Sequence, residues 1–100
     1  MFKEINRTIH EPARLLLLLY LFTVEKADFT FLKRETGFTQ GNLSSHLNKL
    51  ESEAYIISEK SFKNKRPLTI IRITEKGRAD FEAYVKGMQI YFTDLRRLFK

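Results

Sequence analysis

Residues 39–51 read TQGNLSSHLNKLE, and this stretch is apolar on one side and small and polar on the other. A helix turns by about 100° per residue, so Leu43, Leu47 and Leu50 form one stripe that faces a core. The opposite side carries short side chains and a single cation: Gly41, Asn42, Ser45, Asn48 and Lys49. Ser, Asn and Gly lower helix propensity, whereas ordinary surface helices expose Glu, Lys, Arg, Gln and Ala. On this side of the helix, small hydrogen-bonding side chains therefore take the place of residues with a higher helix propensity.

Such an outer face suits a helix that lies in a DNA major groove, where base edges present donors and acceptors in a sequence-dependent pattern. The alternative is an ordinary amphipathic helix whose polar face is only solvated. An amphipathic pattern alone fits the second interpretation, but the low helix propensity of the outer side favours the first, and the neighbouring segments strengthen it.

The chain has 100 residues, enough for one domain with one core. Hydrophobic residues make up 43% and include nine Phe, which can fill that core. A net charge of +6 favours a polyanionic partner, chiefly nucleic acid or an anionic membrane surface. Cysteine is absent, so disulfides and thiolate metal sites are excluded and the cytoplasm is the expected compartment.

The apolar run from Leu15 to Phe22 is too short for the roughly 20 residues of a membrane span. It is flanked by Glu11 and Glu25, and no small-residue cleavage site follows it, so it does not resemble a signal peptide. We expect a buried helix here and no membrane partner.

Three helices are predicted in the first half of the chain. Pro12 suits the first turn of a helix that runs to about Thr23. A second, short helix follows, with Thr30 as N-cap and Gly37 as its C-terminal stop. Thr39 is the expected N-cap of the third helix. Helix two, a turn with Gly37, and helix three together indicate a helix-turn-helix.

β-branched and aromatic residues at 55–57 and 69–73 predict two paired strands. The intervening stretch, SEKSFKNKRP, is expected to be a loop that Pro67 ends. It is strongly basic and carries Lys60, Lys63, Lys65 and Arg66. A solvated lysine-rich loop would look the same, but this one directly follows the candidate recognition helix.

A long terminal helix is expected from about residue 75 to 99, with Thr74 as N-cap. At 1.5 Å per residue it would extend about 37 Å, which is more than a small three-helix body can cover. Its apolar residues recur at heptad spacing and predict a homodimer interface: Phe81, Tyr84, Met88, Tyr91, Phe92, Leu95, Leu98 and Phe99. Gly87 would permit close approach of another backbone. Packing within the chain, against Phe2, Ile5 and Ile9, is the alternative.

The order of these elements resembles a winged-helix transcriptional regulator, similar to the ArsR and MarR families. The motifs that carry this resemblance are HEPARLLLLLYL, DFTFLKRETGFTQGNLSSHLNKLESEAYI and RITEKGRADFEAY. It implies a mainly α fold with a small β-hairpin (α+β), a winged helix-turn-helix with a long C-terminal dimerisation helix. One domain would span residues 1–100, with the recognition helix at about 39–52, the wing at about 55–73 and the dimerisation helix at about 75–99.

The resemblance also implies which residues face or flank DNA. On the third helix these are Gln40, Gly41, Asn42, Ser44, Ser45, His46 and Lys49, and at the wing tip Lys63, Lys65 and Arg66. Lys60, Lys33 and Arg34 are further candidates for phosphate contacts. In one departure, Ala54 stands where many relatives place a Gly. In another, the lack of cysteines and of histidine clusters puts metal sensing of the ArsR type in doubt.

We therefore expect sequence-specific binding of double-stranded DNA by a homodimer that regulates transcription, with repression favoured over activation. A winged-helix adaptor that binds proteins without reading DNA is the alternative. No enzyme is expected, because no nucleophile with a base, carboxylate pair or glycine-rich phosphate loop is visible.

The two histidines remain to be placed. His46 borders the apolar stripe and suits either packing or a phosphate contact, and His10 suits a structural role beside Pro12. Without cysteines they make a weak metal site, so neither a metal nor a cofactor is expected. The sequence does not identify a small-molecule effector.

Overall fold

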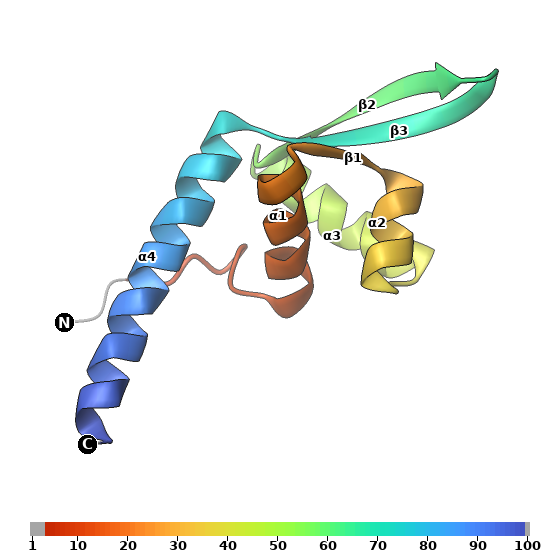
Figure 1. The fold of residues 1–100 in the computed structure, drawn as a ribbon. Coiled ribbons are helices and arrows are strands. Elements are labelled where there is room, and N and C mark those ends of the chain that lie inside the picture. The colour runs from red at the N-terminus through yellow and green to blue at the C-terminus, as the bar shows by residue number, and fades with distance from the viewer. Residues whose placement is uncertain (1–3, 100) are drawn as a thin grey trace.

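A computed structural model describes residues 4–99, which form four helices and a three-stranded antiparallel sheet. In chain order the elements are α1 (Pro12–Val24), β1 (Lys26–Asp28), α2 (Phe29–Thr36), α3 (Gln40–Ser52), β2 (Ile56–Lys63), β3 (Arg66–Ile73) and α4 (Glu75–Leu98). Figure 1 shows α1, α2 and α3 gathered at the base of the sheet, with the β2–β3 hairpin projecting to one side and α4 to the other. The predicted α+β winged-helix fold is confirmed.

The core lies where these helices meet the base of the sheet. From α1 it takes Leu17, Leu18 and Leu21, and the other buried residues are Ile9, Leu32, Leu43, Leu47, Leu50, Tyr55, Ile56, Ile71, Ile73 and Phe81. The leucine stripe of α3 is thus buried as predicted, and the apolar run in the first helix is a core helix. No helix among residues 4–99 has both the length and the apolarity needed to span a membrane.

The wing has the predicted extent, but its strands are longer than the sequence predicted. The strand order is β1-β3-β2, and most of the expected loop is strand, with Lys60 opposite Thr69 and Phe62 opposite Pro67. Only Asn64 and Lys65 form the turn, with φ values of 54° and 65°. Positive φ at both central residues is what tight two-residue hairpins require. Pro67 is tolerated inside β3 because β1 pairs only as far as Ile70, so β3 has one neighbouring strand at that point.

The start of α2 differs from the prediction by two residues. Asp28, not Thr30, is the N-cap, and its carboxylate accepts a hydrogen bond of 2.8 Å from the Phe31 backbone N–H. The cause is β1, a strand that the sequence does not predict. Because β1 ends at Asp28, α2 begins at the next residue. Gly37 ends α2 at φ 72°, and Thr39 caps α3 by accepting from the Asn42 N–H, both as expected.

The end of α3 gives position 54 a backbone conformation that favours glycine. Ala54 has φ 61°, in the left-handed region. Its N–H donates to the Glu51 carbonyl at 2.9 Å, and the Tyr55 N–H donates to the Leu50 carbonyl at 3.0 Å. This pair of bonds is a Schellman motif, which favours glycine at the left-handed position.

The Thr-Glu-Lys-Gly motif joins α4 to the end of α3. The Thr74 hydroxyl accepts from the Gly77 N–H at 2.9 Å and donates to the Ala54 carbonyl at 2.7 Å. A Cβ at position 77 would collide with the Tyr55 carbonyl oxygen. Gly77 therefore permits the close approach that fixes where α4 leaves the body.

Candidate nucleic-acid interface

The outer face of α3 is exposed along its length. Of the residues predicted to face DNA there, Gln40, Gly41, Asn42, Ser45 and Lys49 are exposed and Ser44 is half-buried. Lys49 forms a surface ion pair with Glu53, with its Nζ 3.7 Å from the Glu53 carboxylate. Such exposed pairs are weak, so Lys49 is free to exchange partners.

One side of α3 shares a hollow with the wing, which we call the α3–wing groove. It has a volume of about 440 Å³ and is bordered from α3 by Gln40, Ser44, Asn48 and Glu51 and from the hairpin by Ser58, Lys60 and Thr69. The Ser58 hydroxyl donates to the Glu51 carboxylate at 3.2 Å, which links the two walls. The amide-bearing side of α3 thus faces the base of the basic hairpin.

The wing cations divide between this groove and the tip. Lys60 borders the groove, with its Nζ 3.3 Å from the Thr69 hydroxyl. Lys63 and Arg66 lie opposite each other in the register of β2 and β3, and Lys65 lies in the turn between them. All three are exposed. Four cations therefore follow one hairpin from groove to tip. Lys33 and Arg34 of α2 are also exposed.

Sequence reasoning missed part of the groove. Asn48 was placed on the outer side of α3 but not among the DNA-facing residues, and Ser58 and Thr69 were assigned only to a loop and a strand. The signal for Asn48 was its spacing of four and eight residues from Ser44 and Gln40, which puts all three on one helix side. Ser58 and Thr69 carried no comparable signal, because their placement depends on the strand register.

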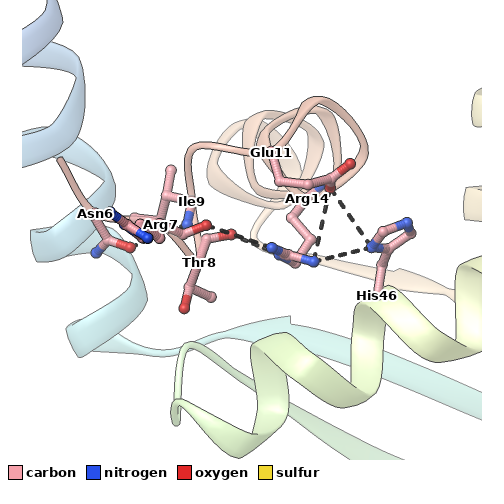
Figure 2. A network of polar contacts seen from close by, with 7 residues as sticks. All are labelled: Asn6, Arg7, Thr8, Ile9, Glu11, Arg14 and His46. Carbon is pink, nitrogen blue, oxygen red and sulfur yellow. Dashed lines mark hydrogen bonds and ion pairs between the residues drawn. The ribbon is translucent and has the colours of Figure 1, made fainter.

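His46 is half-buried and turned away from the exposed side of α3, and its predicted place among the residues that face or flank DNA stays a prediction. Figure 2 shows its ring directed toward α1, where Nδ1 lies 3.3 Å from Arg14 Nη1 and 3.6 Å from Glu11 Oε2. The ring centroid lies 6.4 Å from that of Phe38. The physical reason is its position at the edge of the leucine stripe, from which the side chain reaches the neighbouring helix. The packing alternative holds for His46.

Glu11 stays ionised at the centre of this contact. Burial alone would raise the pKa of its carboxyl group. Hydrogen bonds from the backbone N–H groups of Arg14 and Ala13, together with the charge of Arg14 and that of His46 whenever its ring is protonated, outweigh that effect and hold the pKa below its usual value. The carboxylate accepts from the Arg14 N–H at 2.8 Å, which makes Glu11 the N-cap of α1.

The apolar stripe of α4 splits into a packed half and an exposed half. Phe81 is buried in the chain's own core, with its ring centroid 5.3 Å from that of Phe22, and its part in a dimer interface stays a prediction. The heptad pattern shows an apolar face but not what covers it. Tyr84, Met88 and Tyr91 are half-buried. Phe92, Leu95, Leu98 and Phe99 are exposed, Leu98 by 77% and Phe99 by 83%.

The alternative of packing within the chain accounts for part of the stripe. Ile9 is buried in the core, and Ile5 lines a hollow beside Tyr84 and Tyr91, whereas Phe2 lies outside the described residues. A second, apolar groove of about 740 Å³ lies between α1 and α4 and is lined mainly by Leu15, Leu16, Leu19, Val85, Met88 and Phe92. A methyl group at position 87 would have no described atom within 4 Å other than those of its own stretch of helix.

Comparison with known proteins identifies the family. Residues 13–92 match the model of the winged helix DNA-binding domain. The chain belongs to this family. A protein of Methanocaldococcus jannaschii, itself uncharacterised, is 40% identical over 79 residues, which cover 79% of this chain and 86% of that protein.

Solved structures agree with the fold. A transcriptional regulator homologue from Pyrococcus horikoshii OT3 superposes with a TM-score of 0.86 at 26% identity, over 90% of this chain and 89% of that one. MarR gives 0.78 at 20% identity, over 94% and 68%. Overoxidised AbfR bound to DNA gives 0.69 at 20% identity, over 93% and 76%. The last two show the fold alone, and the predicted resemblance to a winged-helix protein is confirmed.

Proposed function

We propose that this protein binds double-stranded DNA sequence-specifically as a homodimer and regulates transcription in the cytoplasm, as a repressor rather than an activator. The observation that carries the proposal is the α3–wing groove. There, one polar side of α3 stands beside a hairpin that carries Lys60 at the groove and Lys63, Lys65 and Arg66 toward its tip. A protein-binding adaptor would have little use for that concentration of charge.

The two parts of the interface have different tasks. Gln40 and Asn42 lie in the first turn of α3, are exposed, and carry amides that can pair bidentately with adenine in the major groove. The wing cations contact phosphates, which position the protein and supply affinity without reading sequence. Ser45 and Asn48, also exposed on α3, extend the set of hydrogen-bonding groups, and Asn48 borders the α3–wing groove.

The homodimer follows from the exposed half of α4. Soluble proteins seldom leave large apolar side chains such as Phe92, Leu95 and Phe99 to water along one continuous stripe. A second copy covers this stripe and the apolar groove between α1 and α4, in an arrangement with two-fold symmetry. Two α3 helices then enter successive major grooves of a roughly palindromic site.

The DNA-bound AbfR structure supports the proposal, because that protein has this fold and was solved on DNA. The test is a titration of the wild-type protein against random duplex and against the duplex recovered by repeated selection from a random pool. With eight wing cations per dimer, the logarithm of affinity should fall against the logarithm of salt concentration with a slope of about −7. The selected duplex should bind at least about 1,000-fold more tightly than random duplex.

The adaptor alternative makes the opposite prediction. A winged helix that binds only proteins would show no enrichment in the selection and no steep salt dependence. That result would leave the fold assignment intact and remove the proposed function.

A further inference from the structure

The segment that precedes α1, residues 4–11, contacts three separate parts of the molecule. The Asn6 side-chain amide donates to the Tyr55 hydroxyl at 2.8 Å, just beyond the end of α3. His10 Nδ1 lies 2.7 Å from the Tyr84 hydroxyl on α4. Ile9 is fully buried in the core between these two contacts. We call residues 4–11 the N-terminal segment.

Arg14 joins this segment to α3. Its Nε donates to the Thr8 carbonyl at 2.6 Å, and its Nη2 donates to the Arg7 carbonyl at 3.4 Å. Its Nη1 lies 3.3 Å from His46 Nδ1, as Figure 2 shows. Guanidinium groups can only donate, so the His46 nitrogen accepts in this contact. One side chain thus connects two backbone carbonyls of the N-terminal segment to a residue of α3.

The Arg14 side chain is engaged in contacts within the chain and is poorly placed to contact DNA. Its side chain is 17% exposed, and its donors are directed to carbonyls and to the ring. Glu11 Oε2 lies 3.9 Å from Arg14 Nη1 and 3.6 Å from His46 Nδ1, so the carboxylate balances the charge of the arginine. The contact is therefore internally satisfied and needs no phosphate.

We propose that Arg14 is a positioning residue for DNA recognition: it sets the placement of α3 relative to the N-terminal segment and, through the His10–Tyr84 contact, relative to α4. The inference rests on the proposed function. Reading bases requires the amides of α3 to meet base edges in good hydrogen-bond geometry, whereas long flexible lysines on the wing tolerate small displacements. Loosening Arg14 should therefore affect discrimination between sequences more than binding to random DNA.

The experiment measures the ratio of affinities for selected and random duplex in Arg14→Gln and in the matched control Arg78→Gln. Arg78 is a half-buried arginine of α4, paired with Glu25 and placed over the Phe22 ring, so the control removes the same charge and comparable packing away from α3. Arg14→Gln should lower the ratio by about 2- to 30-fold, the range that residues acting at a distance produce. Arg78→Gln should leave the ratio within about twofold of wild type, since it has no contact with α3 among those described.

A second variant separates positioning from phosphate contact. Arg14→Lys keeps the charge, but one ammonium cannot reproduce the fork between two carbonyls and the His46 ring. It should also lower the ratio, with the salt slope unchanged. A uniform loss on both duplexes in Arg14→Gln, with a slope less negative by about 2 for the dimer and recovery in Arg14→Lys, would make Arg14 a phosphate contact and overturn the inference.

The link to α4 is tested by a double-mutant cycle. Tyr84→Phe removes the hydroxyl that holds His10, and Tyr20→Phe on α1 is the control. Tyr84→Phe should lower the ratio, and its effect should be non-additive with that of Arg14→Gln, because both break one connection. An unchanged ratio in Arg14→Gln, or additive effects in the cycle, would refute the inference while leaving the proposed function standing. Wild-type protein without salt-dependent DNA binding would remove both.

Discussion

The recognition helix α3 and the terminal helix α4 leave opposite kinds of surface exposed. In α3 the apolar side, Leu43, Leu47 and Leu50, is buried and the polar side stands open. In α4 only Gly77 and Phe81 are buried, and the apolar stripe continues into solvent beyond them. An exposed face of short polar groups is completed by a polar ligand, and an exposed apolar stripe by another protein surface. The two helices thus point to two different partners.

The same contrast separates the forces at the two surfaces. The proposed contacts between wing cations and phosphates would release counterions and weaken steeply as salt rises. Apolar contacts along α4 exclude water and respond little to salt of moderate concentration. Salt and substitution should therefore act on one surface at a time.

The largest effect is expected at the wing. The triple variant Lys63→Ala, Lys65→Ala, Arg66→Ala should bind random duplex at least about 100-fold more weakly at about 50 mM salt, with a slope less negative by about 5 for the dimer. Fluorescence anisotropy across a salt series measures both quantities. The matched control removes three exposed cations from α4, Lys86, Arg96 and Arg97, and should keep a slope close to that of wild type. Equal losses in the two triple variants would contradict the assignment of the wing.

The next effect concerns the dimer. Phe92 and Ile90 are exposed by 56% and 64%, but Ile90 lies on the opposite side of α4 from the stripe. Phe92→Glu should weaken self-association at least about 100-fold, because two carboxylates would be buried at a symmetric interface. Ile90→Glu should leave it unchanged. Sedimentation velocity measures the association state, and circular dichroism should show both variants folded. Dimers of equal strength in both would exclude this face.

The two glycines of α4 extend the contrast between its packed and exposed halves. Gly77→Ala should destabilise the fold by about 1–3 kcal/mol, because the new methyl group collides with the Tyr55 carbonyl. Gly87→Ala should stabilise it by up to about 1 kcal/mol through helix propensity, since no described atom stands in the way. Thermal unfolding of the two variants measures whether each is more or less stable than wild type. A weaker dimer in Gly87→Ala would instead place a partner backbone at Gly87.

The smallest effect lies at the end of α3. Ala54 holds a left-handed conformation at φ 61°, which glycine adopts without strain. Ala54→Gly should raise the free energy of unfolding by about 0.5 kcal/mol after the greater freedom of glycine in the unfolded chain is deducted. That corresponds to about 2–4 °C in melting temperature for a domain of this size. A lower melting temperature would mean that the Schellman motif does not strain Ala54.

The helices of this protein could be predicted because each carries both a period and a boundary. The leucine stripe of α3 shows its buried side, and Thr39 and Gly37 mark where helices start and stop. β1 has only three residues, which is too few to show an alternating pattern. The projecting part of the wing is solvated on both faces, so its strands have the composition of a loop.

The exposure of the candidate site residues was predictable, but the placement of residues at its edges was not. The exposed positions of Gln40 and the wing cations follow from composition and position in the chain. His46 and Phe81 lie at the borders of their apolar stripes. At such a border, a small rotation about the helix axis determines whether a side chain faces a partner or packs against the rest of the chain. That decision depends on where α1 and its N-terminal segment lie, and no local pattern contains it.

The most direct measurement compares Gln40→Ala with Lys63→Ala on the selected duplex and on random duplex. Gln40→Ala should weaken binding to the selected duplex by about 1–3 kcal/mol and leave random binding unchanged, because the amide reads a base. Lys63→Ala should weaken both equally and make the salt slope less negative by about 1 per subunit. If Gln40→Ala weakened both duplexes alike, or Lys63→Ala changed only the selected one, the assignment of bases to α3 and phosphates to the wing would be wrong.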